Sequence, residues 1–230
     1  IMRITNKIIL LISALLAAIA ISAQNHYEPN IAIGAKGGYT MSKLAFNPSV
    51  PQNMQGGLMI GATFRYAEEK NFGLIAEFNI EQRGWKEKYE GTSFQFNKQL
   101  TYIQIPVLTH IYFSSNHFKG FFNAGPEIGY MIATKTSSNF DYNNIANVPD
   151  FPTQNRYNDQ LTLPIKNKFD YGISAGAGVE WIMNRKHSFN LEGRFYYGLN
   201  NVFSSKKTDP FSGSNSMSIM LTLGYYYRIK

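Results

Sequence analysis

The chain has 230 residues, a formal net charge of +7, no cysteine, 17 Phe and 15 Tyr. The absence of cysteine excludes disulfide bridges, thiolate metal sites and thiol nucleophiles. Only 16% of the residues are charged, against about 25% in an average soluble protein, and the fold has to account for this deficit.

The first segment has the pattern of a secretory signal peptide. Arg3 and Lys7 precede an apolar run from Ile8 to Ile21, which is followed by small residues up to Ala23. A membrane-spanning helix needs about 20 apolar residues, whereas a basic start and a shorter apolar run are typical of an export signal. Cleavage after Ala23 would lower the net charge to +5. The expected organisation is a signal peptide at 1–23, an N-terminal tail at 24–29 and a β-barrel domain at 30–230.

Eight later stretches alternate apolar and polar residues. In one of them Leu74, Ala76 and Phe78 fall on one face, whereas Glu77 and Glu81 fall on the other. A period of two predicts β-strands with two unlike faces. The predicted strands are 30–43, 57–67, 72–86, 94–113, 118–137, 168–182, 188–200 and 216–229.

The links between these strands alternate in length. The links after the second, fourth and sixth strands are short, and the longest of the others runs from Ser138 to Asn167. Short turns at one end and long loops at the other are typical of outer-membrane barrels, whose long loops are extracellular. The predicted fold is all-β, an eight-stranded antiparallel up-and-down transmembrane β-barrel in the bacterial outer membrane.

One face of the predicted strands is almost free of charge, and the other collects six acidic and five basic residues. A small soluble barrel such as a lipocalin would place the apolar face inside, so the signal peptide favours a lipid-facing apolar wall around a polar lumen. The residues of this predicted lumen charge network are Lys36, Arg65, Glu77, Glu81, Arg83, Glu127, Asp170, Glu180, Glu192, Arg194 and Arg228.

The predicted lumen is filled by its own side chains. An eight-stranded barrel leaves an interior only wide enough for side chains, and buried charges are tolerated when they are paired. The alternative is an ion pathway or a catalytic carboxylate pair. His110 faces the same lumen and is interpreted as a hydrogen-bonded histidine and not as a catalytic base. The remaining histidines are scattered, so no catalytic residue, metal or cofactor is expected.

Aromatic and glycine residues have predicted places as well. Rings at strand ends are expected in the two interfacial girdles of the membrane, and lumen-facing glycines are expected to make room for large neighbours. The predicted girdle residues are Tyr66, Trp85, Tyr102, Trp181, Tyr225 and Tyr227.

Several stretches resemble the PorT-like outer-membrane β-barrel proteins of Bacteroidetes, often called porin-family or outer-membrane β-barrel domain proteins. The more specific ones are Tyr102-Ile103-Gln104-Ile105-Pro106 and Ala124-Gly125-Pro126-Glu127. The resemblance covers nearly the whole chain after the signal and implies an outer-membrane barrel. The namesake takes part in type IX secretion, but membership does not transfer that role. The chain departs from the usual aromatic last residue, since it ends Arg228-Ile229-Lys230.

The long link from Ser138 to Asn167 carries four aromatic residues among several Asn and Asp. One interpretation is a mobile, solvated extracellular loop. The other is recognition of sugars or of a protein partner, because loops on a rigid scaffold commonly carry binding. Removal of residues 140–158 would then abolish binding and leave the barrel folded. The candidate binding residues are Phe140, Tyr142, Phe151 and Tyr157.

The sequence therefore favours a non-enzymatic structural or surface-recognition role. The alternatives are a narrow porin, an accessory of type IX secretion and a lipid-modifying enzyme at the barrel rim. The expected partners are outer-membrane lipids, lipopolysaccharide and the barrel-assembly machinery, together with an unidentified extracellular ligand. The chain is expected to be a monomer that binds no nucleic acid.

Overall fold

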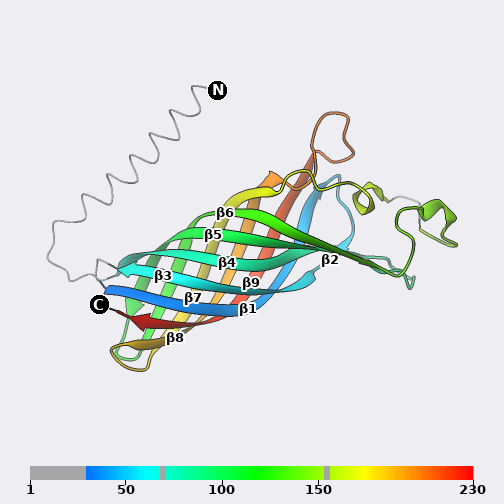
Figure 1. The fold of residues 1–230 in the computed structure, drawn as a ribbon. Coiled ribbons are helices and arrows are strands. Elements are labelled where there is room, and N and C mark those ends of the chain that lie inside the picture. The colour runs from blue at the N-terminus through cyan, green and yellow to red at the C-terminus, as the bar shows by residue number, and fades with distance from the viewer. Residues whose placement is uncertain (1–29, 68–70, 153–155, 230) are drawn as a thin grey trace, which may run out of the picture.

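The described residues form a barrel of long antiparallel strands that is capped by links at one end (Figure 1). The computed structural model describes residues 30–67, 71–152 and 156–229. The predicted signal peptide and N-terminal tail lie outside these ranges. Within them, no helix is long and apolar enough to cross a membrane.

Each long strand pairs with the next one along the chain, and the first pairs with the last. The closed ring contains eight strands, in the order β1-β3-β4-β5-β6-β7-β8-β9, so the predicted fold class is confirmed. The elements are β1 (Asn30–Asn47), β2 (Gln52–Asn53), β3 (Gln55–Ala67), β4 (Phe72–Glu87), β5 (Phe96–Ser114), β6 (Phe118–Ser138), the 3-10 helices η2 (Ile145–Asn147) and η3 (Asp159–Leu161), β7 (Phe169–Ile182), β8 (His187–Asn201) and β9 (Gly213–Arg228).

The strand boundaries lie within a few residues of those predicted, and the largest differences fall at the long-link end. β1 continues to Asn47, and β9 begins at Gly213. The two residues are paired in the β1–β9 ladder. The strands extend further because this ladder continues past the apolar part of the wall, where alternation no longer marks a lipid-facing side.

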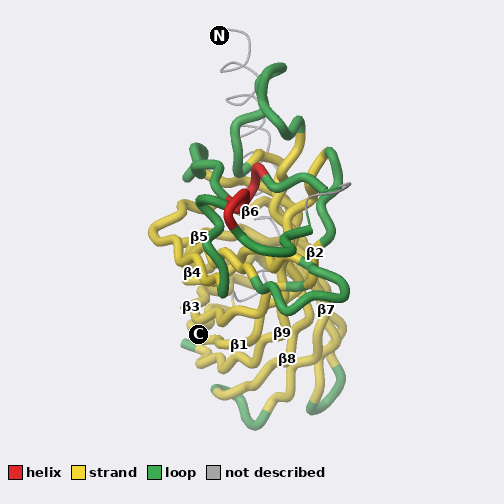
Figure 2. The backbone as a smooth tube through the Cα atoms, turned by 90° about the vertical axis from the view of Figure 1, so that its right-hand side faces the viewer, coloured by secondary structure: helices red, strands yellow, loops and turns green. Residues whose placement is uncertain are grey.

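The links confirm the predicted asymmetry. β5 and β6 are joined by residues 115–117 and β7 and β8 by 183–186, whereas 139–168 join β6 to β7. In outer-membrane barrels the short turns are periplasmic and the long loops extracellular. Figure 2 views the barrel from the long-link end, where the long links cross its mouth.

The two faces of the wall also follow the prediction. Leu58 and Leu223 point outward with 62% and 67% of their surface exposed, whereas Glu81 and Arg83 point inward and are 0% and 1% exposed. The girdle prediction is wrong for two of its residues, because Trp85 and Tyr102 are fully buried inside the barrel. Their positions continue the inward register of β4 and β5.

Glycine makes room for large side chains inside the barrel, as predicted. A Cβ atom on Gly172 would lie 2.8 Å from the ring of Tyr196, and one on Gly178 would lie 2.5 Å from the ring of Phe121. Both distances are shorter than van der Waals contact, so these rings occupy the space that a side chain on β7 would need.

Candidate functional site: the filled lumen and its apolar cap

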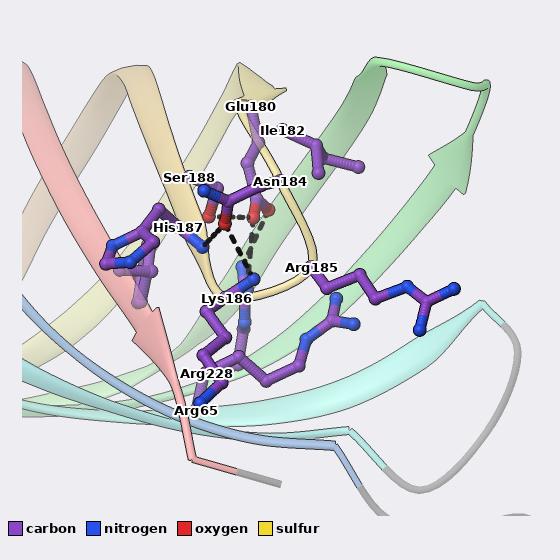
Figure 3. A pocket seen from close by; sticks show the side chains of 10 residues that line it. Arg65, Glu180, Ile182, Asn184, Arg185, Lys186, His187, Ser188 and Arg228 are labelled. Carbon is purple, nitrogen blue, oxygen red and sulfur yellow. Dashed lines mark hydrogen bonds and ion pairs between the residues drawn. The ribbon is translucent and has the colours of Figure 1, made fainter.

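The end of the lumen next to the short turns is occupied by an ion pair between β3 and β7. The guanidinium of Arg65 donates two hydrogen bonds to Glu180, at 2.7 and 3.1 Å, and Ser188 Oγ donates a third at 2.6 Å (Figure 3). Arg65 also lies over the ring of Tyr226, 4.3 Å from its centroid. The cavity that remains here is about 10 Å³, and a single water needs at least about 10–15 Å³.

The middle of the lumen is organised around Glu77 on β4. Its carboxylate accepts hydrogen bonds from Lys36 Nζ at 2.5 Å and from two guanidinium nitrogens of Arg194 at 2.7 and 2.8 Å. Arg194 also bonds Glu192 at 2.9 Å, and Asn123 donates to the same carboxylate. These contacts join β1, β4, β6 and β8 across the interior.

The third level of the lumen places three carboxylates around one guanidinium. Arg83 lies 2.9 Å from Glu81 and 3.4 Å from Asp170, and it also pairs with Glu127. Tyr196 donates a 2.9 Å hydrogen bond to Asp170, and its ring lies 3.9 Å from the guanidinium. Among the described residues, no group of His, Cys, Asp or Glu is arranged to hold a metal ion.

Ten of the eleven residues predicted for the charge network lie buried in these ion pairs. The exception is Arg228, which is partly exposed at the rim next to the short turns. Lys119 on β6 supplies a fifth buried cation, which is not among the predicted residues. Its alternation with Phe121 and Asn123 on the inward face could have revealed it. His110 is buried as predicted, with Nδ1 2.7 Å from Asn123 Oδ1.

An apolar cluster closes the long-link half of the barrel. Trp85, which is fully buried, packs edge-on against Phe46 and Phe203 with ring centroids 5.9 and 5.7 Å apart. We call this cluster the cap. Its buried members are Leu44, Phe46, Val50, Trp85, Tyr89, Phe96, Leu100, Tyr102, Met131, Phe151, Leu161, Val202, Phe203 and Phe211.

The long link folds into the cap. Phe140 and Phe151 pack against each other at 5.0 Å and against Tyr89 at 5.8 and 5.7 Å, and Tyr142 packs against Phe96 at 5.5 Å. The expectation of a solvated loop is therefore wrong for these three rings of the link. Hydrophobic burial turns them inward because the cap offers an apolar surface above the lumen.

A polar contact fastens the same link to the top of β4. Arg156 pairs with Glu87, donates a 2.6 Å hydrogen bond to the backbone oxygen of Lys88 and lies 4.0 Å from the centroid of Tyr89. Gln160 donates to Glu87 at 3.2 Å. Burial, reinforced by the Glu87 carboxylate, raises the pKa of the Tyr89 phenol, which keeps it neutral. We call these contacts the latch.

The outer side of the link carries a depression of about 380 Å³. Tyr142 contributes an aromatic face to it, while the other lining residues contribute mainly amide, carboxylate and guanidinium groups. Tyr157, the fourth predicted binding residue, is 45% exposed and lies outside this lining. We call the depression the link cleft. It is lined by Tyr142, Asn143, Ile145, Arg156, Asn158, Asp159 and Thr162.

A closed ring with an apolar outer wall and an ionic interior has the physical character of a transmembrane barrel. The family model described as outer membrane protein beta-barrel domain matches residues 22–204. The chain belongs to this outer membrane protein β-barrel family. The protein is accordingly located in the bacterial outer membrane.

Solved structures of other outer-membrane barrels are similar to this family member at low sequence identity. Neisserial surface protein A is 12% identical with a TM-score of 0.47, and the match covers 86% of this chain and 96% of that one. OprG of Pseudomonas aeruginosa is 11% identical with a TM-score of 0.49, covering 88% and 98%. The outer membrane enzyme PagL is 12% identical with a TM-score of 0.42, covering 84% and 97%. No curated protein matches the chain in sequence.

Some of the residues described above for this outer-membrane barrel could have been found from the sequence, and others could not. Glu87 continues the inward register of Glu81, Arg83 and Trp85, so alternation could have placed it inside. Arg156 gave no such signal, because it lies in a link whose path is set by its contacts with the cap. The lumen follows from a local period of two, whereas the cap and latch depend on the packing of distant segments.

Proposed function

We propose that this outer-membrane barrel is a closed, non-enzymatic scaffold that displays its extracellular links for recognition and does not conduct solutes. The observation that carries the proposal is the occupied interior. Three levels of ion pairs fill the lumen, and the cap covers its extracellular end.

Conduction would require the interior to come apart at several levels. A solute would have to separate Arg65 from Glu180, Arg194 from Glu77 and Arg83 from its carboxylates, and then displace the cap. Separating one buried pair leaves uncompensated charge at a cost of about 3–5 kcal/mol. The successive levels therefore oppose a continuous water path.

Planar bilayer recording tests the closed interior. The purified full-length barrel is expected to show no steady conductance, whereas a general porin reconstituted in the same way verifies the assay. Sustained openings on the nanosiemens scale would refute the closed scaffold and favour the narrow porin. An altered lipid composition in a deletion strain would favour the lipid-modifying enzyme instead.

The link cleft is the surface that suits recognition. The ring of Tyr142 lies beside Asn143, Asn158 and Asp159, and aromatic faces with neighbouring amide and carboxylate groups match the apolar faces and hydroxyls of sugars. The latch and the cap hold this surface in place. We therefore propose an oligosaccharide as the ligand class.

Point substitutions test the cleft better than a deletion. Removal of 140–158 would also take Phe140 and Phe151 out of the cap, so lost binding would have two causes. The double variant Asn158→Ala, Asp159→Asn should reduce binding to a soluble oligosaccharide array by about tenfold, since lost hydrogen bonds of this kind contribute about 0.5–1.5 kcal/mol each. Asn116→Ala, in a periplasmic turn, is the control. Equal binding by all three proteins, or by none, would exclude the cleft.

We also propose that the barrel is a member of the PorT-like group of Bacteroidetes outer-membrane proteins. The two sequence elements that support this lie opposite each other in the wall, with Pro106 of β5 paired to Glu127 of β6. Gly125 approaches the backbone oxygen of Val107 so closely that a Cβ atom would lie 2.2 Å from it. Adjacency of the gene to secretion genes would support an accessory role in type IX secretion, and scattered unrelated neighbours would argue against it.

A further inference from the structure

The outer wall of the barrel carries charge at one end only. Every described strand carboxylate points inward. By the alternation of the described strands and, in β6, by the register shift that pairs its last residues with β5, the charged residues that point outward are three lysines, at the extracellular ends of β1, β4 and β6. These residues are Lys43, Lys86 and Lys135.

Two of these lysines flank a band of amide side chains. Lys86 is paired across the ladder with Asn97 of β5, and Gln99 of β5 is paired with Lys135 of β6. With neighbouring strands about 4.8 Å apart, β4 and β6 bring the two ammonium groups to opposite sides of the same amides. A small depression of about 120 Å³ is lined by Lys86 and Asn97 and extends from them to Ser137.

A larger depression lies in the wall beside this band, where the β3–β4 ladder is interrupted. The ladder runs from Tyr66–Leu74 to Met59–Glu81 and resumes at Asn53–Lys86 of β2 and β4. Between these two paired segments, the side-chain oxygen of Gln82 takes the place of a backbone acceptor. It accepts hydrogen bonds from the Leu58 N–H at 3.2 Å and from Gln99 at 3.3 Å.

Glycine deepens this depression. A Cβ atom on Gly56 would lie 2.0 Å from the hydroxyl of Tyr39, so the tyrosine ring reaches across β3 at this point. The resulting hollow has a volume of about 500 Å³. Its lining combines apolar groups with amides and one cation: Tyr39, Met54, Gln55, Gly56, Gly57, Leu58, Gln82, Lys86, Asn97 and Gln99.

We propose that the outer wall of β3 to β6 at the extracellular end is a binding site for the phosphorylated sugar headgroup of lipopolysaccharide. Lys86 and Lys135 pair with its phosphates, and Gln82, Asn97 and Gln99 bond its hydroxyl and amide groups. Tyr39 and Leu58 contact the first segments of its acyl chains.

Position and charge complementarity favour this occupant. The lysines lie directly above the apolar band, at the level where outer-leaflet headgroups meet the wall, and lipid headgroup phosphates attract cations at membrane surfaces. No outward carboxylate on a described strand opposes them. A soluble protein partner would have to displace lipid from the same wall. The proposal does not depend on whether the barrel conducts or binds an oligosaccharide.

Native mass spectrometry of the full-length barrel in detergent tests the site with defined probes. Bis-phosphorylated lipid A is compared with its dephosphorylated form and with phosphatidylglycerol. The double variant Lys86→Gln, Lys135→Gln is compared with the wild type and with Lys206→Gln, Lys207→Gln, whose lysines lie in the exposed β8–β9 link. Heat-modifiable migration on a gel verifies that each variant is folded.

The wild type and the link variant are expected to retain bis-phosphorylated lipid A in preference to the other two lipids. The double variant should lose affinity by roughly 30-fold, since each cation near a lipid surface contributes about one kilocalorie per mole. Equal retention of the dephosphorylated form, equal retention of phosphatidylglycerol, or unchanged binding by the folded double variant would each overturn the proposal.

Discussion

The two interiors of this barrel have opposite character. The lipid-facing section encloses ion pairs such as Arg194–Glu77, whereas the extracellular section encloses the rings of Trp85, Phe203 and the rest of the cap. Lipid acyl chains surround the first section, and hydrated headgroups and water surround the second. Burying apolar groups gains little when the outside is already apolar, so only the water-exposed section gains stability from a hydrophobic core.

The two interiors meet at Arg83 and its aromatic neighbours. Its guanidinium lies 5.6 Å from the ring of Tyr102, which belongs to the cap, and Trp85 follows two residues later on the same face of β4. Of the two tryptophans of the chain, Trp85 lies in the cap. Trp181 is half exposed on the outer wall of the lipid-facing section. Their fluorescence therefore reports separately on the cap and on the lipid-facing section.

The largest effect is expected from Arg83→Met. This change leaves Glu81, Glu127 and Asp170 without their cation, and removal of one partner from a buried charge cluster costs about 3–5 kcal/mol. Urea unfolding in detergent, followed through Trp181 in a Trp85→Phe background, measures the loss.

Arg228→Met provides the matched control, because Arg228 lies partly exposed at the rim. Surface substitutions usually change stability by less than about 0.5 kcal/mol. Similar unfolding curves for the two variants would mean that the lumen ion pairs contribute no more than a surface arginine does.

Phe203→Ala is expected to weaken the cap without opening the lipid-facing section. Truncating a buried phenylalanine costs about 3 kcal/mol or more, and here the loss should be local. Trp85 fluorescence should shift to the red at lower urea concentration, while the Trp181 transition stays in place. An equal shift of both transitions would show that the two interiors unfold as one cooperative unit.

Arg156→Ala is expected to have a smaller effect than Arg83→Met or Phe203→Ala. It removes the cation of the latch and should free the 139–168 link, because a hydrogen bond to a charged group contributes about 1.5 kcal/mol. Cleavage by chymotrypsin after Phe140 and Phe151 should accelerate about tenfold.

Lys88→Ala is the control for the latch. It removes the exposed ion pair with Glu90 but keeps the backbone oxygen to which Arg156 donates. Its cleavage rate should match that of the wild type. Equal acceleration in both variants would place the anchoring of the link elsewhere than in the latch.

The sequence predicted the lumen well because strand alternation is a local property. Glu77, Glu81 and Arg83 are assigned to one face by their spacing alone, and closure of the ring brings that face inside. Which carboxylate each arginine contacts was not predictable. Arg65 and Glu180, for example, meet across the barrel from β3 and β7.

The cap was not predictable by the same means. Rings at strand ends usually lie at the lipid interface, so Trp85 and Tyr102 are predicted to lie there. Their inward positions follow from strands that extend beyond the acyl chains of the membrane, where a hydrated wall requires an apolar interior. Phe140 and Phe151 belong to an irregular link, whose residues have no period to indicate a face.

Closure of the ring through β1 and β9 constrains how the barrel enters the membrane. This ladder joins Ala32 to Arg228 and Asn47 to Gly213, residues from opposite ends of the domain. Before it forms, both strands are open edges, and unpaired backbone groups cannot be left in hydrocarbon. The arginines would also lack their carboxylates from the opposite wall. Strand-by-strand insertion into bare lipid is therefore disfavoured, and the sheet has to curl into a nearly complete ring before lipid surrounds it.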